Sequence, residues 1–328
     1  IDTFHLIRYP YSNFSLNGDL EQKKFQGTAG MDDENIRFSF NGMIDASDSI
    51  PDMDFNFNLI GANLMALNLA EEDIRVGAMV SSSVSGSKLD NLNGKIKLND
   101  LIFVRDNEIH ELDSMLIKAK NLENQTELTA SSRILQASYK GTVKPSDISS
   151  KLWSHLNLFF SYKGSQAKNP VIPGKFNFEA HIDDHDLISG VFLPGLNSFQ
   201  GIDIKVDYDE ENNELNSESI ISPINYKNID IDSVYINANS KDSILLVKID
   251  SKGFRQDLIN IPGILAEARL GNDIAKLIFK VTDQQAKEKY LISGTLSNEA
   301  DLITAHFDSS KLTLNYDSWE LPSDHSII

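Results

Sequence analysis

The chain of 328 residues contains no cysteine. This absence excludes disulfide scaffolds, thiolate metal sites and cysteine nucleophiles. It is compatible with a cytosolic protein and with a bacterial exported protein that folds without oxidation. Cysteine content alone does not separate these two locations.

Positive charge is also scarce. The chain has 30 Lys and Arg against 48 Asp and Glu, a net charge of −18. This charge repels phosphate backbones and anionic membrane surfaces, and no run of Lys and Arg interleaved with aromatic residues offsets it. The sequence therefore predicts a protein that does not bind nucleic acid.

Long apolar runs are missing, and so is a leader. No segment approaches the 18 apolar residues of a membrane-spanning helix, and Asn63 and Asn68 interrupt the most apolar stretch, 59–69. The chain begins at Ile1 without an initiator Met or a basic and apolar leader. We therefore expect one elongated β-rich piece, 1–328, of a longer protein. Weak sub-boundaries are expected near 76–88, 144–156 and 183–200.

Motifs that carry chemistry are missing as well. The chain has no P-loop, dinucleotide fingerprint or H-E-x-x-H motif, and the serine-rich run 81–87 lacks the G-x-S-x-G pattern, so we interpret it as a loop or polar strand. His181 and His185 form the one His/Asp cluster, but His181 falls on the polar side of a predicted strand and His185 in the next loop. The Asp/Asn-rich segment 209–213 lacks the EF-hand pattern and is predicted to be a turn. We predict no enzyme, no metal site and no cofactor.

The chain is rich in segments in which apolar and polar residues alternate. Phe176, Phe178, Ala180 and Ile182 alternate with polar residues over 175–182. A β-strand sends successive side chains to opposite faces, so such a segment has one apolar and one polar face. Many further segments repeat the pattern, which predicts an all-β, antiparallel-rich, elongated sheet with one long apolar face. Whatever covers that face is the functional question.

The in-phase apolar residues are the predicted inward-facing set. We expect many of them to line a groove and some to be simple core. They are Phe38, Phe40, Phe55, Phe57, Ile96, Leu98, Met115, Ile117, Phe176, Phe178, Ile204, Val206, Ile236, Leu312 and Leu314.

Turn signals every 8–12 residues predict about 25 strands. Glycines such as Gly42 and Gly94 open several runs and are predicted in hairpin turns, because glycine tolerates positive φ. Short helices are predicted over 145–156, 185–192 and, more weakly, 254–260.

Four segments carry a family resemblance. Residues 89–103 (LDNLNGKIKLNDLIF), 112–119 (LDSMLIKA), 138–147 (SYKGTVKPSD) and 307–319 (FDSSKLTLNYDSW) resemble the TamB/AsmA-like envelope proteins of Gram-negative bacteria, the translocation and assembly module TamB family. A departure occurs at 325–327, where His-Ser-Ile replaces the family's Asn-x-Ile. The abundance of Asn, Asp, Lys and Ile is typical of a Bacteroidota-type member. The resemblance implies that the chain is a middle fragment of such a protein.

The resemblance implies a sheet curled lengthwise into an open groove, a β-taco, in a periplasmic protein whose full length is anchored in the inner membrane. It also implies transport of phospholipids toward the outer membrane and a role in outer-membrane biogenesis. The expected partners are phospholipid acyl chains and, through regions outside this fragment, an outer-membrane barrel.

Alternation alone leaves other architectures open. Tandem β-sandwiches have the same pattern on their inner faces and would indicate a surface adhesin or a carbohydrate-binding module. An outer-membrane barrel also alternates, but the expected aromatic girdles are missing. A β-helix enzyme would require a short regular repeat, which the chain lacks.

Overall fold

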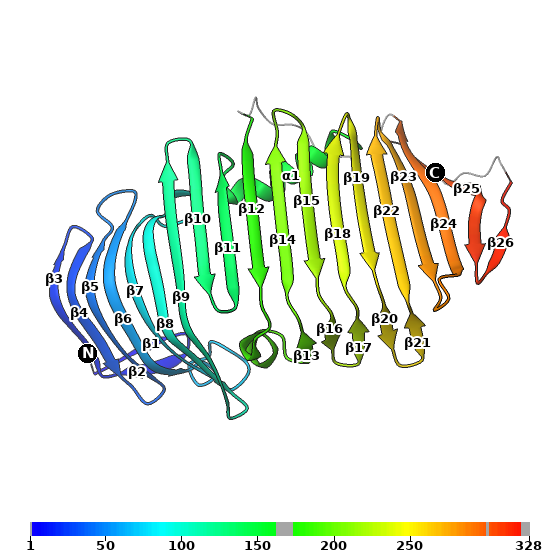
Figure 1. Cartoon of the computed structure of the whole chain (residues 1–328). Coiled ribbons are helices and arrows are strands. Elements are labelled where there is room, and N and C mark those ends of the chain that lie inside the picture. Colours follow the sequence, from blue (N-terminus) through cyan, green and yellow to red (C-terminus); the bar gives the residue numbers. More distant parts are fainter. Residues whose placement is uncertain (1, 162–172, 300–301, 323–328) are drawn as a thin grey trace. The chain divides into compact units, whose positions relative to one another are not determined.

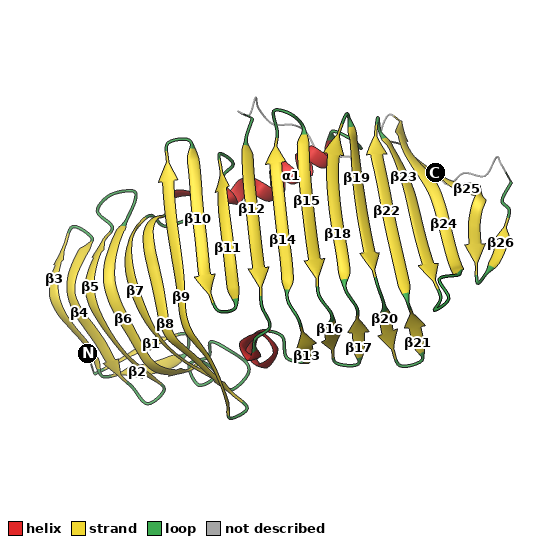
Figure 2. Ribbon diagram, in the orientation of Figure 1, coloured by secondary structure: helices red, strands yellow, loops and turns green. Residues whose placement is uncertain are grey.

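The computed structural model describes residues 2–161, 173–299 and 302–322. The chain is all-β, with 66% of residues in strands and 8% in helices (Figure 2). The prediction of antiparallel sheet with a few short helices is therefore confirmed, and the sheet is not closed into a barrel. Segment 325–327, where the sequence departs from the pattern of the family that it resembles, lies outside the described residues.

Two compact units share the chain. The first comprises Ile1–Tyr139 and Asp183–Gly195, and the second comprises Lys140–Ile182 and Leu196–Ile328. We describe each unit by itself.

In the first unit, strands β3 to β10 form an antiparallel meander in which each strand pairs with the next one along the chain (Figure 1). Hairpin β1–β2 forms a separate two-stranded sheet. The elements are β1 (Thr3–Leu6), β2 (Tyr9–Ser12), β3 (Phe14–Glu21), β4 (Lys24–Asp32), β5 (Ile36–Asp45), β6 (Asp52–Asn63), β7 (Ile74–Ser85), η1 (Leu89–Asn91), β8 (Asn93–Arg105), β9 (Glu108–Leu122), β10 (Gln125–Ser132) and η3 (Ile188–Phe192). Strand β11 (Leu135–Gly141) begins in this unit.

The second unit has two sheets. Its main sheet has the order β12-β14-β15-β18-β19-β22-β23-β24-β25-β26, and a five-stranded sheet has the order β13-β16-β17-β20-β21. Figure 1 shows the small sheet beyond the lower ends of the main strands. The elements are η2 (Pro145–Asp147), α1 (Ile148–Asn157), β12 (Lys175–Ile182), β13 (Leu196–Phe199), β14 (Ile202–Asp209), β15 (Glu214–Ile221), β16 (Ile224–Tyr226), β17 (Ile229–Ile231), β18 (Val234–Lys241), β19 (Ile244–Ser251), β20 (Phe254–Gln256), β21 (Ile259–Ile261), β22 (Gly263–Gly271), β23 (Ile274–Thr282), β24 (Glu288–Glu299), β25 (Leu302–Leu314) and β26 (Asp317–Trp319).

The tight turns use residues other than glycine. Hairpin β8–β9 turns through Asp106 and Asn107, with φ of 52° and 63°, the left-handed pair that a two-residue turn requires. The glycine prediction was wrong at two positions, because Gly42 and Gly94 lie inside β5 and β8. A Cβ on Gly42 would meet the Asp54 carbonyl oxygen at 2.3 Å, so only glycine permits this approach between β5 and β6.

Two helix predictions are confirmed and one is wrong. Residues 145–157 form η2 and α1, and η3 lies within the predicted segment 185–192. Residues 254–260 instead belong to hairpin β20–β21, with Asp257 at φ 49° in its turn. Pairing of β20 with β17 supplies a sheet edge that the local sequence did not reveal.

A buried carboxylate fastens hairpin β1–β2 to the meander of the first unit. Asp33 accepts hydrogen bonds from the hydroxyls of Tyr9 and Ser12, both at 2.6 Å, and from the backbone N–H groups of Ser12 and Asn35. Burial alone would raise the pKa of Asp33, but these hydrogen bonds outweigh it and lower the pKa from 3.8 to about 2. Beside it, Tyr11, Met31, Ala62 and Leu67 form a small core.

Replacing this carboxylate is expected to loosen the hairpin. Because the folded pKa lies below the unfolded one, ionised Asp33 stabilises the fold above about pH 4, and this contribution is lost as the pH falls through about 2. We expect Asp33→Asn to lower the free energy of unfolding by about 2 kcal/mol at pH 7. Urea unfolding at pH 7 and pH 3 tests this, since the deficit should shrink at pH 3. An equal deficit at both values would contradict the role of the charge.

Candidate functional site

The strand register of the first unit aligns its predicted inward-facing residues on one face. Phe40 pairs with Phe57, Phe57 with Val80, and Val80 with Leu98. Leu98 in turn pairs with Met115 on β9. Paired residues share a face, so a continuous apolar row crosses the meander. The predicted residues on this face are Phe38, Phe40, Phe55, Phe57, Ile96, Leu98, Met115 and Ile117.

The second unit repeats this arrangement on its main sheet. Phe178 pairs with Val206, and two rows of aligned residues continue from β12 to β25. The predicted residues on its apolar face are Phe176, Phe178, Ile204, Val206, Ile236, Leu312 and Leu314. The residues that alternate with them along the strands point to the opposite face and are mostly polar, for example Lys205 and Asp207.

Only the margins of the first apolar face are covered. At one margin, hairpin β1–β2 and the segment around Leu67 pack near Phe38. At another, Leu187 and Val191 of the η3 region pack with Leu112 and Ile134, near Met115. Between these two small cores, Phe40, Phe55, Phe57, Ile96 and Leu98 are half-buried.

In the second unit, α1 and the residues after it cover one cross-strand row. We call residues 145–161 the α1 strap. The covered row is buried. Its member Phe176 is 2% exposed and packs on Tyr208, with 5.3 Å between the ring centroids. Phe176 is therefore core, whereas Phe178, two residues along the same face, is half-buried. The buried members of the row are Phe176, Tyr208, Leu215, Ser240, Leu245 and Ala275.

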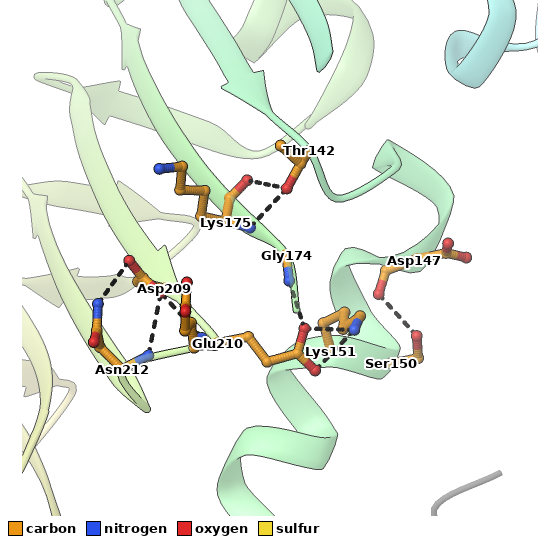
Figure 3. A network of polar contacts seen from close by, with 10 residues as sticks. Thr142, Asp147, Ser150, Lys151, Gly174, Lys175, Asp209, Glu210 and Asn212 are labelled. Atoms are coloured by element: carbon orange, nitrogen blue, oxygen red, sulfur yellow. Dashed lines mark hydrogen bonds and ion pairs between the residues drawn. The ribbon is translucent and has the colours of Figure 1, made fainter. Parts of the chain in front are cut away.

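An ion pair holds the strap to the sheet (Figure 3). Lys151 Nζ lies 2.8 and 2.5 Å from the two carboxylate oxygens of Glu210, which follows β14. Glu210 also accepts from the backbone N–H of Gly174 at 2.8 Å. Both charged side chains are mostly buried, so this pair is screened less than a surface pair and fixes the position of the helix. Figure 3 also shows the predicted turn 209–213, where Asp209 accepts from the Asn212 side chain.

A buried histidine continues this anchorage. His155 Nε2 lies 2.9 Å from the Ser240 hydroxyl, which donates to the Asn213 carbonyl oxygen at 3.0 Å and accepts from the Leu215 N–H. The hydroxyl has one proton, so Nε2 carries the proton of the ring and donates it to Ser240. Burial lowers the pKa of His155, because desolvation disfavours the imidazolium, and Glu210 opposes this only in part. The strap is thus docked through a neutral imidazole.

The middle rows of the second apolar face remain open to solvent. Ile249, Leu277, Phe279 and Phe307 are each 37–41% exposed. A sandwich interior would bury such side chains almost fully, so no second layer seals this part of the described unit. The two middle rows contain Phe178, Val206, Ser217, Ala238, Val247, Ala268, Leu277, Gly294 and Phe307, and Ala180, Ile204, Ser219, Ile236, Ile249, Ala266, Phe279, Ile292 and Leu312.

A pocket of about 420 Å³ lies on this face across β19 to β25. Its small residues, Ala266, Ala268 and Gly294, alternate across the strands with larger ones such as Leu277 and Phe279, which form its walls. Its lining is almost wholly apolar, as suits a hydrocarbon ligand.

None of the residues that line this pocket was among the predicted inward-facing residues. Lys276 and Lys280 flank Leu277 and Phe279, but the apolar Ile278 between them interrupts the alternation, so the signal is weaker than in the predicted segments. Ala268 carries no such signal, because alanine is equally common in other environments and only the register places it between Val247 and Leu277.

The other candidate residues have local structural partners. His181 lies on the polar side of β12 and contacts Asp203 Oδ1 at 2.6 Å. His185 is buried in the first unit, where its Nε2 lies 2.6 Å from Arg133 Nη2. Ser81 lies in β7 and donates to Asn56, so this serine run is a polar strand. Within the described ranges, no cluster of three His, Cys, Asp or Glu residues is arranged to hold a metal.

The described residues include no helix long and apolar enough to cross a membrane. No family model, curated protein or solved structure matches the chain.

Proposed function

We propose that this chain is a non-enzymatic lipid-binding segment, whose open apolar faces hold the acyl chains of phospholipids while their headgroups stay in water. One observation carries the proposal: the middle rows of the second unit are aligned, apolar and half-exposed, and they contain the apolar pocket across β19 to β25. Monomeric proteins seldom leave such a surface without a ligand or partner.

The energetics favour an acyl chain as that ligand. Each methylene that leaves water contributes about 0.8 kcal/mol, so a chain of a dozen buried methylenes gains roughly 10 kcal/mol before the entropic cost of binding. Nine strands from β12 to β25 share the face, and their spacing of about 4.8 Å gives a track of roughly 40 Å. Half the hydrocarbon core of a bilayer is about 15 Å thick, so the track has room for more than one chain.

The cellular role is proposed from the family resemblance. A TamB/AsmA-like segment would carry phospholipid through the periplasm between the inner and outer membranes and support outer-membrane biogenesis. Its anchor in the inner membrane, and any contact with an outer-membrane barrel, would lie in other parts of the protein. A track of equivalent apolar positions suits this role, because a lipid can move along it without a single strong site.

Native mass spectrometry with lipid extraction, on protein purified from bacterial cells, tests the proposal. We expect co-purifying phospholipid at more than one copy per chain. A lipid-free monomer that also takes up no added phospholipid would overturn the proposal and direct the search to glycan binding.

A further inference from the structure

A second cavity, of about 670 Å³, lies where β23 and β24 end in the second unit. Its lining includes β21 with Leu258 before it, residues 281–285, Lys289 and the tyrosines Tyr290 and Tyr316. Figure 1 shows this hairpin beside the lower ends of β23 and β24. Phe279 lines both this cavity and the apolar pocket, so the two are neighbours along one strand.

The side chains change from apolar to charged along that strand. Leu277, Phe279 and Val281 alternate on the apolar face of β23, and Asp283 begins the turn that follows. A ligand lying parallel to β23, with its tail beside Leu277, would therefore place its other end at this turn.

Two ammonium groups lie at this turn: Lys289 lines the cavity, and Lys287 contacts Tyr316, which lines it. Lys287 Nζ lies 4.9 Å from the ring centroid of Tyr316, and Lys289 Nζ lies 5.6 Å from that of Tyr290. Neither lysine has a carboxylate within 4.0 Å in the described part of the chain.

Two carboxylates of this region make hydrogen bonds or ion pairs of their own, and Asp283 also interacts electrostatically with Lys287 at longer range. Asp283 accepts from the backbone N–H groups of Gln285 and Lys287 and from the Tyr316 hydroxyl, contacts that hold the turn together. Glu288 pairs with Lys280 at 3.8 Å and accepts from the Thr313 hydroxyl. The two ammonium groups thus remain available to an anionic group of a ligand.

We propose that Lys287 and Lys289 bind the phosphate of a glycerophospholipid whose acyl chain lies in the pocket across β19 to β25. This inference rests on the proposed function and adds to it a polarity for the bound lipid, with the tail beside Leu277 and the phosphate at the turn after β23. Lys289, which lines the cavity, lies over the ring of Tyr290, and Lys287 lies beside the cavity over the ring of Tyr316.

The test compares two monomeric ligands with the same acyl chain, lysophosphatidylethanolamine and a monoacylglycerol that lacks phosphate. The double variant Lys287→Gln/Lys289→Gln is expected to bind the lysophospholipid about tenfold more weakly and the monoacylglycerol within twofold of the parent protein. A control pair, Lys241→Gln/Lys276→Gln, removes the same charge from exposed positions outside both cavities and should change neither affinity. Inorganic phosphate at 10 mM is added to separate a lipid phosphate site from a free anion site.

The outcomes distinguish this inference from the proposed function. Equal affinities of the double variant and the parent protein for the lysophospholipid, or equal loss for both ligands, would overturn the inference while leaving lipid binding intact. Displacement of the lysophospholipid by inorganic phosphate would overturn it in favour of an anion site. If the parent protein binds neither ligand, the proposed function itself fails.

Discussion

An Ala268→Phe variant is expected to lose most of the lipid held by the second unit. Ala268 lies between Val247 and Leu277 in a middle row and forms part of the pocket floor. A phenyl ring there would occupy the space that an acyl chain needs, and because the face is open, the ring can extend into solvent without displacing the core. We expect at least a tenfold loss of affinity for a lysophospholipid, measured by titration, with unchanged secondary structure by circular dichroism.

Ala268→Ser is the matched control for this variant. It adds one polar atom at the same position and leaves the pocket volume nearly unchanged, so lipid binding should fall much less. If Ala268→Phe binds lipid as the parent protein does, the pocket across β19 to β25 is not the binding site.

Phe176→Ala and Phe178→Ala are expected to differ sharply, although the two residues lie two positions apart on one face. Phe176 is buried beneath the α1 strap, so its truncation should cost about 3–5 kcal/mol of unfolding free energy. Phe178 is half-buried, so its truncation should cost about 1–2 kcal/mol and act mainly on lipid binding. Urea unfolding and lipid titration of both variants measure the two effects.

Similar losses of stability in both variants would contradict this division of the face into a covered row and open rows. A loss of lipid binding in Phe176→Ala alone would place the ligand beneath the strap. Lys151→Met can be compared with Phe176→Ala. It removes the ion pair with Glu210 that docks the strap, but it removes no apolar surface from the face of the sheet.

Much of the fold could be predicted from local pattern, because alternation is a direct consequence of strand geometry. The alternation at Phe38 and Phe40, or at Ile204 and Val206, assigns each residue to a face before any pairing is known. Nothing local distinguishes Phe176 from Phe178, since α1, whose sequence begins 28 residues before Phe176, decides which of them is covered. The hairpin at 254–260 was missed for a similar reason: its strands are stabilised by β17 and by each other.

The site was less predictable than the fold. A groove requires small residues next to large ones across neighbouring strands. Ala266 lies between Ile249 and Phe279 only because β19, β22 and β23 pair in this register, which the local sequence does not show. The lysines at the turn after β23 were equally unpredictable, because Lys287 and Lys289 look like lysines of any solvated turn until the neighbouring cavity is known.

The meander of the first unit has a consequence for how the protein unfolds and how a sheet of this kind can vary in length. Each strand from β4 to β9 pairs only with its two neighbours in sequence. The stability of the meander is therefore close to a sum of hairpin and nearest-neighbour contributions, as in repeat proteins. Such a chain is expected to unfold in steps from its ends. Adding or removing two strands at a time preserves strand direction and the assignment of residues to faces, so the length of the apolar track can change by whole hairpins without a new fold.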